Sequence, residues 1–192
     1  MSDIITLTPQ QIIRRRAQGE PIHSDEKKRM TRHIIAVLVE NSIGALNRVI
    51  NLFSARGFNL ESVAVGETDD PTVSRMTVVT TGDDRIIAQV NRQLNRLVDV
   101  LEVEDLTEKH YVERELCLLK IRYTAQNRSE LMDTLDIFRG KVVDVTTDTI
   151  TFELTGPTKK INAFIGMMQP HGIEEIARSG RVAMSRAMQF GD

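Results

Sequence analysis

The chain has 192 residues, 41% hydrophobic and 27% charged, which is the composition of a globular protein long enough for two small domains. Its formal net charge of −2 indicates no basic surface for nucleic acid or an anionic membrane. It has a single cysteine, so it forms no intramolecular disulfide, and no apolar run is as long as a membrane span or a secretory leader. These features predict a cytoplasmic protein.

Residues 1–31 are predicted to be an N-terminal extension. The segment contains an arginine triplet and a charged run, and at most it favours a short helix over 9–18. Nothing in it is long enough to fold alone. We therefore expect it to be disordered or docked on a partner.

A first unit is predicted over 32–106, in the order βαββαβ. Its helices have apolar residues at helical spacing, and the first one ends at Gly57, a residue suited to a helix C-terminus. The strands are rich in β-branched residues. The predicted elements are a strand over 33–39, a helix over 44–56, strands over 58–65 and 73–80, a helix begun by 82–84, and a strand over 98–103.

The same order recurs over 113–186. The predicted elements there are strands over 115–123, 141–145, 149–154 and 173–177, and helices over 127–138 and 156–168. The whole chain is therefore predicted to be α+β, with two tandem ferredoxin-like units, each a four-stranded antiparallel sheet with two helices on one face. Because the strands are so apolar, we expect the open sheet faces to pair with another chain or with each other.

The turn over 40–46 joins the first strand to the first helix. Asn41 or Ser42 is expected to cap that helix with a side-chain oxygen, and Gly44 has no Cβ to keep a ligand from the backbone. Such a helix start binds small anions and carboxylates. The alternative is that these residues only cap the helix and turn the chain.

No catalytic or metal-binding pattern is present in the sequence. The four histidines are scattered, and there is no nucleophile motif and no glycine-rich phosphate loop. Cys117 lies in an apolar run and is expected to be a buried, inert thiol. These observations favour a binding and coupling module; the alternative is a small ferredoxin-like enzyme.

Residues 37–49 resemble the opening of an ACT domain, the small-ligand regulatory module of amino-acid metabolism. Residues 53–62 and 68–77 narrow the resemblance to the small, regulatory subunits of acetohydroxy acid synthase, also called acetolactate synthase. Later landmarks of that family are matched at 98–101, 112–116, 137–140 and 177–180. The resemblance covers about 32–186, in order.

The resemblance implies a chain with no catalytic residues and no cofactor of its own. It implies a homodimer, formed through ACT domains, that binds the large catalytic subunit, raises its activity and confers feedback inhibition by L-valine. Thiamine diphosphate, magnesium and FAD would belong to the large subunit. An ACT-type amino-acid sensor acting on a different partner, such as a transcription factor, is the alternative.

The family's effector pocket lies where two ACT domains meet. A helix start can bind the carboxylate of valine, side-chain carbonyls can accept from its ammonium, and apolar walls can hold its side chain. Leucine and isoleucine are expected to bind more weakly, because one methylene is worth about 1–3 kcal/mol. The matching positions are Asn41, Gly44, Ala45, Leu46, Asn59 and Leu60.

The second unit has no equivalent ligand turn. Residues 122–127 take its place, and no glycine opens the helix that follows. We therefore expect a dimerisation or docking platform there, with a second effector site as the alternative.

Overall fold

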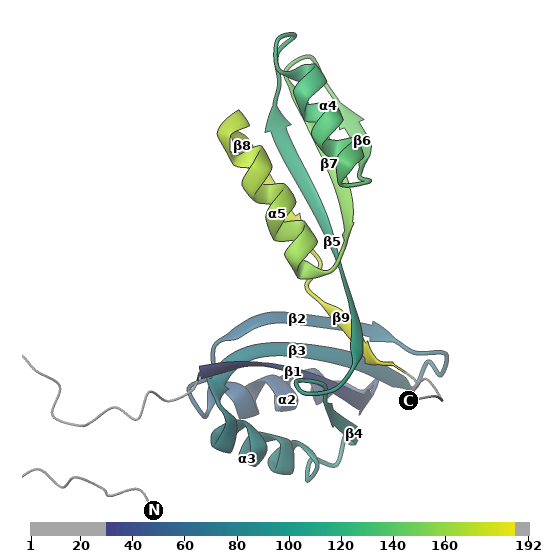
Figure 1. Ribbon diagram of the computed structural model, residues 1–192. Coiled ribbons are helices and arrows are strands. Elements are labelled where there is room, and N and C mark those ends of the chain that lie inside the picture. The colour runs from purple at the N-terminus through teal and green to yellow at the C-terminus, as the bar shows by residue number, and fades with distance from the viewer. Residues whose placement is uncertain (1–29, 187–192) are drawn as a thin grey trace, which may run out of the picture.

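The computed structural model describes residues 30–186. It consists of two sheets, each with two helices on one face, linked by the long strand β5 (Figure 1). The N-terminal unit contains β1 (Met30–Glu40), α2 (Ala45–Ser54), β2 (Leu60–Glu67), β3 (Val73–Asp83), α3 (Asp84–Leu94) and β4 (Val100–Asp105). The helix expected over 9–18, and the rest of the extension up to 29, lies outside the described residues.

The C-terminal unit repeats this order and adds a strand. Its elements are β5 (Tyr111–Arg122), α4 (Arg128–Ile137), β6 (Lys141–Val145), β7 (Thr149–Gly156), α5 (Thr158–Met168), the short 3₁₀ helix η1 (Gln169–His171), β8 (Ile173–Arg178) and β9 (Val182–Ser185). The strand orders are β2-β3-β1-β4 and β6-β7-β5-β8, and neighbouring strands are antiparallel. The predicted α+β fold with two βαββαβ units is confirmed.

Each unit has its own apolar core between its sheet and its two helices. In the N-terminal unit, alternate residues of β1 and β3 pack against Val49 and Phe53 of α2 and against the inner face of α3. Ile87, Val90 and Leu94 of that face are buried, as the helical spacing predicts. A separate cluster in the C-terminal unit centres on Phe152 and Phe164 and includes Cys117.

The way in which α2 ends makes the second strand begin later in the sequence than predicted. Gly57 has a positive φ of 74°, and its N–H donates to the carbonyl of Ser54, while the N–H of Phe58 donates to the carbonyl of Phe53. These two bonds close the helix with the expected glycine cap. Because Phe58 belongs to the cap, β2 begins at Leu60, two residues later than predicted.

The second helix begins at Asp84, within the predicted start over 82–84, but Gly82 itself still belongs to β3. A Cβ at Gly82 would lie 1.9 Å from Cε1 of Phe58, so only glycine leaves room for that ring. Asp83 is the N-cap of α3, and its side chain accepts the N–H of Arg85 at 2.9 Å.

The open face of the N-terminal sheet is partly covered by the chain's own C-terminal strand. β9 pairs with Tyr111–Arg114 of β5, so β5 begins four residues before the predicted strand. Ala183 of β9 packs with Ile34, Ala36, Val79 and Leu106, and its N–H donates to Thr77 Oγ1. In Figure 1 the two-stranded ribbon of β5 and β9 runs from this face to the C-terminal unit. This cover was expected from another chain or sheet, and β9 itself was not predicted.

Candidate functional site

The turn between β1 and α2 is built on Gly44. This residue is the N-cap of α2, in the left-handed region at φ 87° and ψ −8°, where glycine alone is unstrained. No side chain caps the helix, so the expected cap by Asn41 or Ser42 is wrong. The Asn41 amide is directed elsewhere: its Nδ2 donates to Glu67 Oε1 at 3.1 Å and to the carbonyl of Pro71 at 3.0 Å.

The first N–H groups of α2 are not equivalent. The N–H of Ala45 donates to the carbonyl of Ser42 at 3.2 Å, and the N–H of Arg48 donates to the carbonyl of Gly44 at 3.0 Å. For Leu46, the described residues provide no acceptor. The N–H of Asn47 likewise has no acceptor among the described residues, so a bound carboxylate would find free backbone donors at Leu46 and Asn47.

Arg48 adds a positive charge that the sequence reasoning missed. Its Nε and Nη2 donate to both carboxylate oxygens of Asp99, with Nη2 2.6 Å from Oδ1. Hydrogen bonding from Arg48 lowers the pKa of Asp99, and Asp99 in turn raises the pKa of Arg48. The signal for Arg48 was its position one helical turn after Gly44; nothing local pointed to Asp99, which lies 51 residues further along the chain.

Exposed apolar side chains surround the same turn. Ile43 and Val98 are 101% and 91% exposed, and Leu46 and Leu101 are also exposed. Val98 precedes Asp99, the residue that Arg48 holds, so the apolar groups and the ion pair share one end of the unit. Such a cluster is typical of a contact surface.

Asn59 and Leu60 lie at the opposite end of β2 from this turn. Leu60 pairs with Thr80, whereas Glu67, the partner of Asn41, pairs with Ser74. Asn59 is exposed, and its carbonyl accepts the hydroxyl of Thr80 at 2.8 Å. Leu60 and Glu67 are seven steps apart along the strand, about 23 Å at 3.3 Å per step. One chain therefore brings Asn41, Gly44, Ala45 and Leu46 together and leaves Asn59 and Leu60 apart from them.

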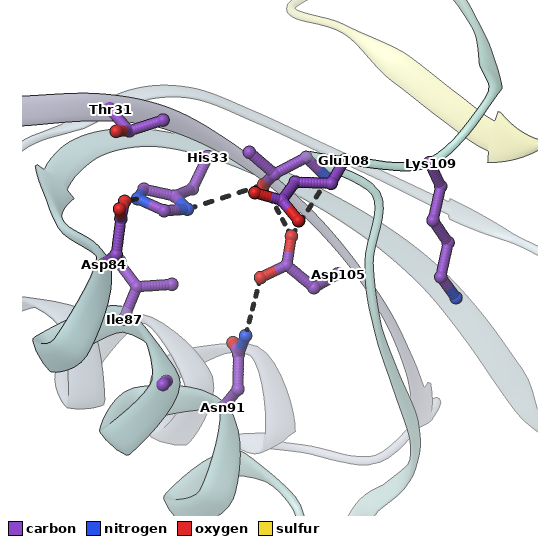
Figure 2. A pocket seen from close by; sticks show the side chains of 10 residues that line it. Thr31, His33, Asp84, Ile87, Asn91, Asp105, Glu108 and Lys109 are labelled. Carbon is purple, nitrogen blue, oxygen red and sulfur yellow. Dashed lines mark hydrogen bonds and ion pairs between the residues drawn. The ribbon is translucent and has the colours of Figure 1, made fainter.

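A cavity of about 760 Å³ contains none of the predicted site residues. It lies between the start of β1, helix α3 and the segment after β4 (Figure 2). Asp105 accepts from Thr107 and Asn91, and Nε2 of the buried His33 is 3.1 Å from Asp84 Oδ1, at an angle that makes no hydrogen bond. The cavity is thus lined by an internal polar network.

Residues 30–186 contain no group of three or more histidine, cysteine or acidic side chains placed to hold a metal. Cys117 is fully buried, and burial raises the pKa of its thiol, so a reactive thiolate is disfavoured. None of the helices in this part of the chain is long and apolar enough to cross a membrane.

Two family models match the two units. One, described as "AHAS small subunit-like ACT domain", matches residues 35–102, and the other, "Small subunit of acetolactate synthase", matches 114–187. A probable acetolactate synthase small subunit of Methanothermobacter thermautotrophicus is 47% identical over 155 residues, or 80% of this chain and 92% of that protein. The chain belongs to the acetolactate synthase small-subunit family.

Further small subunits support this membership. That of Aquifex aeolicus is 49% identical over 166 residues, covering 85% of this chain and 86% of that protein. The crystal structure of the small subunit from Thermotoga maritima superposes with a TM-score of 0.76 at 38% identity, covering 83% of this chain and all of the other. The chain is therefore a regulatory, non-catalytic subunit in branched-chain amino acid biosynthesis, and its N-terminal unit is an ACT domain.

Proposed function

We propose that this small subunit regulates acetolactate synthase by binding L-valine between the ACT domains of a homodimer. It binds the large catalytic subunit and raises its activity, and bound valine inhibits the complex. Thiamine diphosphate, magnesium and FAD belong to the catalytic subunit. One observation is the main support for the proposal. The turn with Asn41, Gly44, Ala45 and Leu46 lies at one end of β2, and Asn59 and Leu60 lie at the other end.

β2 is an edge strand of the ACT sheet as described, and an edge with free N–H and C=O groups invites pairing. If two chains pair through β2 about a twofold axis, the strands run antiparallel. Leu60 of one chain then approaches the partner's Glu67 end, where the Gly44 turn lies. Each dimer would hold two pockets, each with a turn from one chain and Asn59 and Leu60 from the other.

The groups at such a pocket match a free amino acid. The N–H of Leu46 and the guanidinium of Arg48 favour a carboxylate. The side-chain carbonyls of Asn41 and Asn59 are acceptors for an ammonium group. Leu46 and the half-buried Leu60 provide apolar surface for a branched side chain. One extra methylene changes binding by about 1–3 kcal/mol, so leucine and isoleucine are expected to bind more weakly.

Calorimetric titration of the purified chain with L-valine tests this function, with D-valine as the control. We expect stereospecific binding at two sites per dimer and inhibition of the complex reconstituted with the catalytic subunit. Light scattering gives the mass of the species titrated. Absence of L-valine binding by both the dimer and the reconstituted complex would contradict the proposal.

Matched asparagine variants locate the site. Asn41→Ala and Asn59→Ala each remove one acceptor and are expected to weaken L-valine binding at least tenfold, in line with about 1.5 kcal/mol for a hydrogen bond to a charged group. Asn51→Ala, on the exposed surface of α2, is the control and leaves binding unchanged. Equal affinities for all three variants would place the site elsewhere.

The C-terminal unit is proposed to be a dimerisation or docking platform. Where the ACT domain has its glycine turn, this unit has a closed turn in which Asn127 Oδ1 accepts the N–H of Thr124 at 2.7 Å. The N–H of Tyr123 is also taken, by the carbonyl of Asp148. Four valine sites per dimer in the titration would favour the alternative, a second effector site.

A further inference from the structure

The turn between β8 and β9 rests on strand β2 of the ACT domain. The N–H of Arg181 donates to Ser62 Oγ at 2.9 Å. Gly180 has φ +79°, and a Cβ on it would lie 2.8 Å from Ser62 Oγ and 3.2 Å from the carbonyl of Val63. Ser62 is two residues from Leu60. The C-terminal unit thus contacts the strand that carries half of the proposed pocket.

The side chain of Arg181 continues this contact into the C-terminal unit. Arg181 is only 8% exposed, and its Nη1 lies 3.8 Å from Oε2 of Glu113 on β5. The other oxygen of Glu113 accepts the N–H of Thr158, the first residue of α5, at 3.2 Å. Ser62, Arg181, Glu113 and Thr158 therefore form one continuous set of contacts from β2 to the start of α5.

A second ion pair lies beside the same contacts between β5 and the start of α5. Glu115, which is 5% exposed, accepts from Arg178 Nε at 2.6 Å and from Arg178 Nη2 at 2.8 Å. It also accepts the hydroxyl of Thr158 at 3.3 Å. Two carboxylates of β5 thus face the N-terminus of α5, a position that the helix dipole favours. An ion pair with a buried carboxylate tolerates little displacement, because an unpaired buried charge is costly.

We propose that Arg181 couples the effector pocket to the C-terminal unit. Valine binding at Asn59 and Leu60 displaces β2, Ser62 carries the β8–β9 turn with it, and Arg181 and Glu113 transmit the displacement to α5. Arg181 is a positioning residue and touches no ligand. The inference rests on the proposed function, because it takes the valine pocket to include the start of β2.

Hydrogen exchange of the full-length chain tests the coupling without the catalytic subunit. Saturating L-valine is expected to change the exchange rates of the amides in the first turn of α5 at least threefold. In Arg181→Met the change is lost, and in Arg181→Lys, which keeps the charge, part of it returns. Unchanged α5 exchange in the wild type, with L-valine demonstrably bound, would overturn the inference and leave the proposed function standing.

Reconstituted enzyme provides the second readout. Arg181→Met is expected to bind L-valine within about threefold of the wild type and to activate the catalytic subunit, while the inhibition at saturating valine falls from a 5- to 150-fold effect to below twofold. Ser62→Ala removes the β2 contact with less risk to folding, and a smaller loss of inhibition in the same direction is expected. Lys120→Met, which breaks an exposed ion pair with Glu175, is the matched control and leaves inhibition unchanged.

Full inhibition of the enzyme by valine in folded Ser62→Ala and Arg181→Met would contradict the coupling. Failure of L-valine to bind the wild type is a different outcome, because it removes the proposed pocket itself. Circular dichroism and thermal unfolding establish which variants are folded. If Arg181→Met does not fold, the results for Ser62→Ala and Arg181→Lys test the coupling instead.

Discussion

The guanidinium of Arg48 lies against Gly44, with Nη1 3.0 Å from the point that a Cβ on Gly44 would occupy. The start of α2 therefore combines a left-handed glycine, a backbone N–H at Leu46 without an acceptor among the described residues, and a side-chain cation. Asp99 balances that cation through a two-point hydrogen bond. Any side chain at position 44 meets both backbone strain and this charged group.

Two substitutions of Gly44 distinguish the effect of backbone strain from the effect of an added negative charge. Gly44→Ala and Gly44→Asp are both expected to lower the free energy of unfolding by about 1–2 kcal/mol, the cost of a left-handed conformation for residues with a Cβ. The fold survives, because domains are stable by about 5–15 kcal/mol. Only Gly44→Asp is expected to abolish the valine response, because its carboxylate occupies the place of the ligand's.

Urea denaturation and L-valine titration of both variants provide the measurement. Gly44→Ala serves as the control, since it has the same backbone strain without the charge. It is expected to retain valine binding, weakened by no more than about tenfold, or 1.4 kcal/mol. Normal valine inhibition of the enzyme containing Gly44→Asp would exclude this turn from the site.

The Arg48–Asp99 pair predicts a pH dependence of stability. The folded state lowers the pKa of Asp99 from its ordinary value near 4, so its contribution is present above about pH 4 and is lost as the pH falls through the folded pKa. Asp99→Asn removes this contribution. The difference in unfolding free energy between wild type and Asp99→Asn is expected to be constant above about pH 5 and to shrink below pH 4.

Urea unfolding at several pH values measures that difference. Asp133→Asn, at an exposed position on α4, is the matched control for the loss of one carboxylate. A difference between wild type and Asp99→Asn that does not vary with pH would mean that the Arg48–Asp99 pair contributes nothing to folding.

Two glycine-to-alanine substitutions are expected to have opposite effects. At Gly82 the new Cβ would overlap the Phe58 ring, with 1.9 Å between them, and overpacking of this kind costs about 1–3 kcal/mol. At Gly166, on α5, a Cβ meets nothing within 4 Å, and alanine is expected to stabilise the helix by about 0.5–1 kcal/mol. Thermal unfolding of both variants compares them, and a stabilised Gly82→Ala would show that Phe58 does not pack there.

Periodicity predicted most of the fold because it reports local structure. The unbroken apolar run over 33–39 and the helical spacing from Ile86 to Leu97 identify segments that must be buried, and these segments agree with the cores observed. The Gly57 cap also follows from neighbouring residues alone.

Features that depend on distant residues were not predictable. Asn41 bonds to Glu67 and Pro71 instead of capping α2, because β2 and its loop return beside it. β9 has only four residues, and it exists because the start of β5 and the open face of the ACT sheet lie next to it. The Arg48–Asp99 and Arg181–Glu113 pairs likewise join segments far apart in sequence.

Mixing two defective chains tests most directly whether valine binds between subunits. A Gly44→Asp chain destroys the pocket to which it contributes the turn. An Asn59→Ala chain impairs the pocket to which it contributes β2. A mixed dimer keeps one intact pocket, so unfolding and refolding the two variants together at 1:1 is expected to give L-valine sites of wild-type affinity at about one quarter of the wild-type number, because half of the dimers are mixed. Titration calorimetry counts them. No restored site in dimers shown to be mixed would contradict a pocket shared by two chains.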